Sequence, residues 1–354
     1  MTQMTVEQIH QRALAGDGDA QFTLARLFDR EGKHDVAVGW LQKAAAAGHV
    51  MSANYLGVRF LTGQAAPFAP VSGAKLTFQA AEAGNAEACA RAAVLNALGV
   101  GREASWKQAL EWLRKAVKGR HPGAADQLEV LKAEAAFHGQ KGALDLDSLI
   151  VPMEHQVPVR SPRIWVVEKF CSPDTCAWIA SRTKGRLEPA RTYDADLGGR
   201  STNDKRTNTG AGFGLWNSDL VLALARFRIA EATGISFVMF EPVNVLHYDP
   251  GQKFDRHYDY IDPEVPDFAS DLEQRGQRTA TALVYLNDAY EGGETDFPQL
   301  GYSFKGDLGD LLIFFNVDED GRPDPRTLHA GTPPTSGEKW VLSQWIRDKP
   351  QPVL

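Results

Sequence analysis

Two histidines and one aspartate in the C-terminal half of the chain could together hold a metal ion. His257 and Asp259 are separated by one residue, so on a β-strand their side chains point to the same face. His329 follows a strongly apolar segment and would supply a third ligand if two sheets fold over each other. Two imidazoles and one carboxylate leave coordination positions open, which is the arrangement of non-haem Fe(II) oxygenases. The pattern therefore indicates a reactive metal site rather than a structural one.

A second His-Tyr-Asp segment, residues 247–249, has the same form. Asp249 enters the turn Asp249-Pro250-Gly251-Gln252, where its side chain is expected to cap the turn rather than lie in register with His247. No proline or glycine separates His257 from Asp259. We therefore expect His257 and Asp259 to be the metal ligands and His247 to be an ordinary strand residue.

The segments that must position these residues are typical of strands. Runs of β-branched and aromatic residues alternate with clusters of glycine, proline and aspartate, and they lie at residues 164–167, 243–246, 282–286 and 310–315. Residues 173–184 and 217–233 have helical patterns instead. We expect this part of the chain to form a β-barrel or double sheet with helices packed outside it.

The first third of the chain contains an internal repeat. It is rich in alanine and glycine, and one short fragment recurs at nearly constant spacing: Ala15-Gly16, Ala47-Gly48, Ala83-Gly84 and Lys118-Gly119. The segments between these fragments are typical of helix pairs, in which each pair buries its apolar face against the next. We expect a helical domain at residues 1–140, a proline-punctuated linker at 141–162 and the strand-rich domain at 163–354.

Composition excludes several classes of protein. A chain of 354 residues with 43% hydrophobic residues is large enough for two packed domains. The net charge is -7 and no basic block occurs, so we expect no nucleic-acid partner. Three cysteines cannot form a disulfide framework, and neither a secretory signal nor a membrane-spanning apolar run is present. We expect a cytoplasmic protein without a membrane partner.

Several ordered motifs surround the histidines. They are Ser161-Pro162-Arg163-Ile164 with Phe170, Tyr248-Asp249-Pro250-Gly251-Gln252-Lys253-Phe254, His257-Tyr258-Asp259, Tyr285-Leu286-Asn287-Asp288, Gly292-Gly293-Glu294-Thr295 with Phe297-Pro298, Lys305-Gly306-Asp307, Leu328-His329-Ala330-Gly331 and Gly337-Glu338-Lys339-Trp340. With these motifs in this order, residues 163–348 resemble the prolyl 4-hydroxylase branch of the Fe(II)/2-oxoglutarate-dependent dioxygenases. Residues 15–120, with Leu98-Gly99-Val100-Gly101 as one example, resemble Sel-one-like repeats, relatives of the tetratricopeptide repeats.

The two resemblances imply a multidomain α + β protein. An α-helical repeat solenoid would precede a double-stranded β-helix, or jelly-roll, with flanking helices. Fe(II) would be held by His257, Asp259 and His329, and the chemistry would use 2-oxoglutarate and O2, with ascorbate as a candidate reductant. Lys339 matches the family position that pairs with the distal carboxylate of 2-oxoglutarate.

The same resemblance assigns further residues around the metal. Tyr248 and Thr295 match positions that hydrogen-bond around 2-oxoglutarate, and both could instead be structural. Arg278 and Trp345 match positions near the peptide groove, and the alternatives are an ion pair for Arg278 and a packing role for Trp345.

The implied function is hydroxylation of an unactivated C–H bond, with a peptidyl proline as the leading substrate. The helical repeats would then dock a protein or peptide; they could also only cap the barrel or form a dimer contact. Two other functions stay open at this point. One is the same chemistry on a free amino acid or another side chain, and the other is an interaction or oxygen-sensing protein in which the repeats are the working part.

Overall fold

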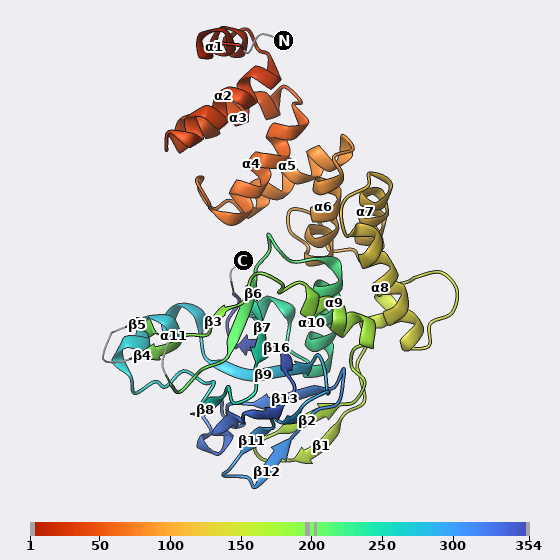
Figure 1. Ribbon diagram of the computed structural model, residues 1–354, viewed down its shortest axis with the longest axis vertical. Helices are drawn as coiled ribbons and strands as arrows, with labels where there is room; N and C mark the ends of the chain where they lie inside the picture. Colours follow the sequence, from red (N-terminus) through yellow and green to blue (C-terminus); the bar gives the residue numbers. More distant parts are fainter. Residues whose placement is uncertain (1–3, 195–198, 202–203, 352–354) are drawn as a thin grey trace.

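The computed structural model describes residues 4–194, 199–201 and 204–351, and it divides into a helical part and a strand-rich part (Figure 1). In the first part each helix packs against the next along the chain. These helices are α1 Val6–Leu14, α2 Gly18–Arg30, α3 His34–Ala46, α4 Val50–Thr62, α5 Pro70–Glu82, α6 Ala86–Leu98, α7 Trp106–Lys118 and α8 Ala124–Phe137. This architecture confirms the predicted helical repeats. Among the described residues, no helix is long and apolar enough to cross a membrane.

The recurring glycines join each helix pair to the next one along the chain. Gly16, Gly48 and Gly84 follow α1, α3 and α5, and all three have a left-handed φ between 87° and 91° that favours glycine. Gly119 differs, because its φ is -75° and the left-handed position moves to Arg120. A Cβ at Gly119 would lie 2.7 Å from the Cβ of Ala86, so this glycine allows close helix packing instead.

The strand-rich part contains two main sheets. The larger sheet has the order β1-β2-β13-β9-β16-β7-β6-β3, and the smaller has the order β12-β11-β14-β8. Their strands are β1 Gln156–Val159, β2 Ile164–Val167, β3 Glu188–Pro189, β6 Thr209–Phe213, β7 Val243–Tyr248, β8 Phe254–His257, β9 Arg278–Tyr285, β11 Thr295–Phe297, β12 Tyr302–Phe304, β13 Leu311–Phe315, β14 His329–Gly331 and β16 Lys339–Arg347. Two short ribbons pair β10 Glu291–Gly292 with β15 Pro334–Ser336, and β4 Thr192–Asp194 with β5 Gly199–Ser201.

The central strands of the large sheet are buried on both faces, as β13 shows. All five of its residues are buried, and alternate side chains enter two different cores. Leu312 and Phe314 pack with Phe297 of the small sheet, whereas Ile313 packs on the side that carries the helices. Those helices are α9 Pro173–Ser181 and α10 Leu220–Thr233, which begin and end close to the predicted boundaries. The predicted helix-flanked double sheet is confirmed.

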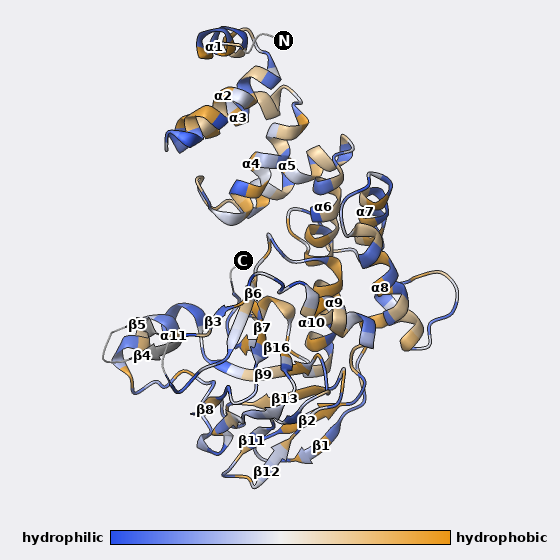
Figure 2. Ribbon diagram, in the orientation of Figure 1, coloured by the Kyte–Doolittle hydropathy of each residue, from blue (hydrophilic) through white to orange (hydrophobic). Residues whose placement is uncertain are grey.

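The helical part is packed against the strand-rich part through α10. Residues Leu220 and Leu224 of α10 share one apolar core with Leu113 of α7 and Leu131 of α8. Figure 2 shows hydrophobic residues along the ribbon of α10. In contrast, α1 to α5 lead away from the sheets (Figure 1). The segment 141–162, which the sequence predicts as a linker, contains β1, and β1 pairs with β2 in the large sheet.

A buried ion pair crosses this junction. Glu134 of α8 pairs with Arg228 of α10, and both side chains are 2% exposed. The other carboxylate oxygen of Glu134 accepts hydrogen bonds from the backbone N–H of Ser172 (2.8 Å) and the hydroxyl of Thr175 (2.7 Å) at the start of α9. Burial opposes ionisation of Glu134, but hydrogen bonding to His138 and the charge of Arg228 outweigh it and lower the pKa to about 2. The carboxylate of Glu134 therefore links α9 and α10 to the helical repeats.

We predict that Glu134→Gln lowers the free energy of unfolding by about 3–5 kcal/mol at neutral pH, because it leaves the buried guanidinium of Arg228 without a counter-charge. Urea denaturation measures this. The exposed Glu129, one turn earlier in α8, is the matched control, and Glu129→Gln should change stability by less than about 0.5 kcal/mol. Since the pKa of Glu134 is lowered in the folded state, its contribution should disappear as the pH falls from 4.5 toward 2. Equal effects of the two substitutions would contradict the assigned role.

Candidate metal centre

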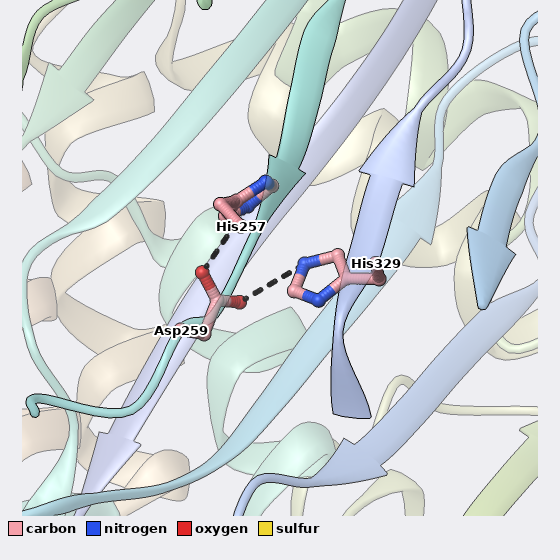
Figure 3. Close-up of side chains that lie close together, drawn as sticks. All are labelled: His257, Asp259 and His329. Carbon is pink, nitrogen blue, oxygen red and sulfur yellow. Dashed lines mark ion pairs between the residues drawn. The ribbon is translucent and has the colours of Figure 1, made fainter. Parts of the chain in front are cut away.

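Strand pairing brings two of the three predicted metal ligands together. β14 runs antiparallel to β8 with His329 directly opposite His257, and the two imidazole centroids are 4.3 Å apart. Asp259 lies just beyond the end of β8 rather than on the strand, yet its carboxylate reaches both imidazoles (Figure 3). The three side chains therefore converge from two adjacent strands and one bend.

The donor atoms are oriented for a shared ion. Nε2 of His257 lies 3.6 Å from Oδ1 of Asp259, and Nε2 of His329 lies 3.7 Å from Oδ2. Each Nδ1 is engaged by a backbone carbonyl, Asp255 O at 2.8 Å and Thr327 O at 3.0 Å. Because Nδ1 carries the proton in that case, both Nε2 atoms are free to donate a lone pair to a metal. The residues present fit an ion bound by two histidines and one carboxylate.

Burial and hydrogen bonding put these ligands in the protonation states that a metal requires. Burial lowers the pKa of His329 to about 4, which keeps its imidazole neutral. Burial opposes ionisation of Asp259, but its interactions with His257, His329 and Thr281 together hold its pKa well below the usual range. Thr281 of β9 donates to Oδ2 of Asp259 at 2.7 Å, and Asn316 donates to Thr281 at 3.1 Å. These bonds hold the carboxylate in place.

A cleft opens beside the three ligands. Residues of both sheets line it: Arg206, Leu246, Tyr248, Phe254, His257, Asp259, Leu283, Thr295, His329, Gly331, Lys339, Val341, Ser343 and Trp345. Lys339 is 3% exposed, and its ammonium donates to Gly293 O at 2.6 Å. Burial lowers its pKa to about 7, although the nearby charge of Glu294 opposes this shift, and the hydrogen bond to Gly293 is to a neutral carbonyl. A buried cation that no carboxylate contacts directly, among the described residues, makes the cleft a receptor for an anion.

The other residues expected to surround that anion lie near Lys339. Tyr248 is directly opposite Lys339 in the pairing of β7 with β16, and its ring centroid is 5.4 Å from the ammonium. Thr295 lines the cleft from β11, and its hydroxyl lies 2.8 Å from that of Tyr285. Tyr285 is fully buried with a satisfied hydroxyl, as a core tyrosine requires.

The two residues expected on the substrate side occupy different positions. Trp345 lines the cleft, and its buried indole N–H has no hydrogen-bond partner in the described part of the chain. Arg278 does not line the cleft. Its guanidinium binds Glu241 at 2.7 and 3.1 Å and lies 3.7 Å from the ring centroid of Trp345. The structure therefore places Arg278 behind Trp345, as a group that can orient the indole.

The prediction that Asp249 caps its turn is wrong. The turn is closed by backbone and glutamine bonds: Gln252 N–H donates to Asp249 O, and Asp249 N–H donates to the Gln252 side chain, both at 2.9 Å. With those bonds made, the Asp249 carboxylate faces His247 instead, at 3.8 Å from Nε2. His247 lies on β7 as expected.

Several residues of the centre were not predicted from the sequence. Thr281 and Asn316 are polar residues in apolar strand segments, which was the available signal, but only the pairing of β9 with β13 shows that they reach Asp259. Phe254 stacks on His257 with ring centroids 3.4 Å apart, and the guanidinium of Arg206 lies 4.3 Å from the ring centroid of Phe254.

Comparisons with known proteins find relatives of both parts of the chain. The family model described as the 2OG-Fe(II) oxygenase superfamily matches residues 243–347. Prolyl 4-hydroxylase 1 of Arabidopsis thaliana is 34% identical over 203 residues, which is 53% of this chain and 70% of that protein. The viral collagen prolyl hydroxylase of Paramecium Bursaria Chlorella virus-1, solved as a 2OG complex, is 30% identical over 52% of this chain and 94% of its own, with a TM-score of 0.41. A Sel1 repeat protein from Oxalobacter formigenes is 26% identical over 35% of this chain and 96% of its own, with a TM-score of 0.33.

We predict that Thr281→Val weakens Fe(II) binding about 10- to 100-fold, because Asp259 loses the hydroxyl that orients it. Anaerobic competition with a chromogenic chelator measures the affinity. The matched control is Thr279→Val on the same strand, since the Thr279 hydroxyl contacts only the backbone O of Ile346, at 3.4 Å, among the described residues. If both variants bind Fe(II) as tightly as the unmodified chain, the orienting role of Thr281 is excluded.

Proposed function

This chain belongs to the 2OG-Fe(II) oxygenases, among the relatives of prolyl 4-hydroxylases, and we propose that it hydroxylates a prolyl residue of a protein or peptide. The observation that carries the proposal is the position of Lys339. It places a buried cation, whose hydrogen bond goes to a neutral carbonyl, in the same cleft as His257, Asp259 and His329. A dianionic co-substrate such as 2-oxoglutarate satisfies the cation at one end and reaches the metal ligands with the other.

The residues that line the cleft have different roles in the proposed reaction. His257, Asp259 and His329 hold Fe(II), which when bound supplies the oxygen activation that C–H hydroxylation with O2 requires. Lys339 fixes the distal carboxylate of 2-oxoglutarate, with Tyr248 and Thr295 as hydrogen-bonding neighbours. The apolar walls formed by Leu246, Leu283 and Val341 exclude water around the reacting groups. Ascorbate is the proposed reductant that keeps the iron in its ferrous state.

Trp345 is the proposed contact for the substrate. An indole offers a flat apolar face to a pyrrolidine ring and an N–H donor to a peptide carbonyl, and the N–H of Trp345 has no partner among the described residues. Arg278 contributes indirectly, because its ion pair with Glu241 holds the guanidinium against the indole. Arg278 is therefore proposed as a positioning residue.

The helical repeats are proposed to have two roles along their length. α6 to α8 share a core with α10 and cap the oxygenase domain. α1 to α4 lie away from the sheets and carry exposed apolar side chains, Val6, Leu14, Val36 and Met51, which suit the docking of a protein substrate. A cytoplasmic location is proposed as well, because the chain has three buried free cysteines.

We predict that Lys339→Ala weakens 2-oxoglutarate binding at least about thirtyfold, because it removes one partner of a buried charge pair. The measurement is anaerobic titration of the Fe(II)-loaded protein with 2-oxoglutarate, followed through the visible band of the chelate. The matched control is Lys349→Ala, at an exposed lysine that donates to Glu273 O.

The same titration has a pH dependence. Since burial lowers the pKa of Lys339 to about 7 in the empty cleft, the affinity for 2-oxoglutarate should fall by up to about tenfold per pH unit above pH 7. Lys339→Ala should abolish this dependence. Binding that Lys339→Ala leaves unchanged would contradict the assignment of Lys339 as the co-substrate anchor.

For the substrate, we predict that proline-rich peptides raise succinate release and gain one oxygen on proline, as seen by mass spectrometry. Trp345→Ala should raise the KM for peptide about tenfold or more, while uncoupled 2-oxoglutarate turnover changes little. Trp216→Ala, at an exposed tryptophan outside the cleft, is the control. Succinate release that responds to free amino acids and not to peptides would overturn the peptidyl substrate and leave the oxygenase assignment intact.

A further inference from the structure

A second group of metal-ligating side chains lies outside the cleft. His247 is the fifth residue of β7, Asp249 follows β7, and Glu338 directly precedes β16. Their nitrogen and oxygen donor atoms all lie within 4.8 Å of one another. Because alternate residues of a strand face opposite sides, Tyr248 and Lys339 point into the cleft while their neighbours His247 and Glu338 point away from it.

The distances suit one small cation. Nε2 of His247 lies 3.2 Å from Oε2 of Glu338 and 3.8 Å from Oδ1 of Asp249. The corresponding nitrogen-to-oxygen distances in the first centre are 3.6 and 3.7 Å. In a tetrahedral zinc site with bonds of about 2.0–2.1 Å, neighbouring donor atoms are about 3.3 Å apart. The second group is therefore gathered as closely as the first.

His247 is held in the orientation that a ligand requires. It is 7% exposed, and its ring lies against that of Trp340 with centroids 4.2 Å apart. Nδ1 is 3.2 Å from the hydroxyl of Thr209 on the neighbouring strand β6. The hydroxyl occupies Nδ1, so Nε2 is the nitrogen that faces the two carboxylates.

The charge of the group favours a cation. The side chains of Asp249 and Glu338 are 53% and 56% exposed, so an ion can reach them from solvent. Within the described ranges of the chain, no lysine or arginine forms an ion pair with either carboxylate. Two carboxylates and one imidazole thus face one point without a permanent positive charge to balance them.

We propose that His247, Asp249 and Glu338 form a second divalent-metal site that takes Zn²⁺, with water as the remaining ligand. One nitrogen and two carboxylate oxygens are a ligand set that zinc accepts. The ion would join the β7–β8 turn to the β15–β16 turn, and these turns flank Tyr248 and Lys339. The inference does not depend on the proposed function.

Isothermal titration of the full chain with Zn²⁺ tests the site. The unmodified protein should bind two equivalents, and His257→Ala/His329→Ala should retain one. In that double-variant background, Glu338→Gln and Asp249→Asn should each weaken the remaining Zn²⁺ binding at least about tenfold. Zn²⁺ should raise the thermal unfolding temperature of the double variant, and either further substitution should abolish this increase. Both substitutions are at half-exposed side chains, which keeps them compatible with folding.

Glu319→Gln, at an exposed glutamate that is not part of the group, is the matched control and should leave Zn²⁺ affinity unchanged. Loss of all Zn²⁺ binding in His257→Ala/His329→Ala would overturn the proposal and leave His247 with an ordinary ion pair to Glu338. Retained binding in the Glu338→Gln and Asp249→Asn proteins would overturn it as well, because the second equivalent would then lie elsewhere.

Discussion

The site depends on one strand pairing, in which β14 meets β8 with His329 opposite His257. A shift by one residue would turn one imidazole to the other face of the small sheet and separate the ligands. The register is held by packing, because the ring of His329 contacts Phe314 of the large sheet and Phe297 of the small sheet, with centroids 4.7 and 5.5 Å away. The apolar core between the sheets and the polar centre at its edge are therefore one structural unit.

Buried charge is handled differently at the two ends of the oxygenase domain. At the junction with the repeats, Glu134 and Arg228 neutralise each other, and the remaining carboxylate bonds go to α9. In the cleft, Lys339 has a carbonyl at 2.6 Å and no carboxylate partner in the residues described. Breaking a buried ion pair would destabilise the folded chain, whereas a buried ion that no opposite charge contacts favours the binding of an oppositely charged ligand. The contrast separates a residue that serves stability from one that serves function.

Local pattern predicted the repeats and the double sheet, and family resemblance pointed to some of the residues that line the cleft, because strand alternation and ordered motifs are visible along the sequence. They failed where the outcome depends on a partner distant in sequence. Thr281 reaches Asp259 only because of how β9 lies beside the bend after β8, and Asp249 turns to His247 only because Gln252 closes the turn. α8 lies within the predicted helical domain, but its sequence does not show that α10 packs against it. Contacts between residues that are distant in the sequence can be identified only in the folded structure.

The burial of α10 has a consequence for how the chain is made. All but two of its 14 residues are buried, so the helix has no face suited to water. Synthesis runs from the N-terminus, so α6, α7 and α8 are complete before α10 leaves the ribosome, and they offer an apolar surface that is ready to receive it. The last helices of the repeat array thus act as a built-in folding template for the oxygenase domain.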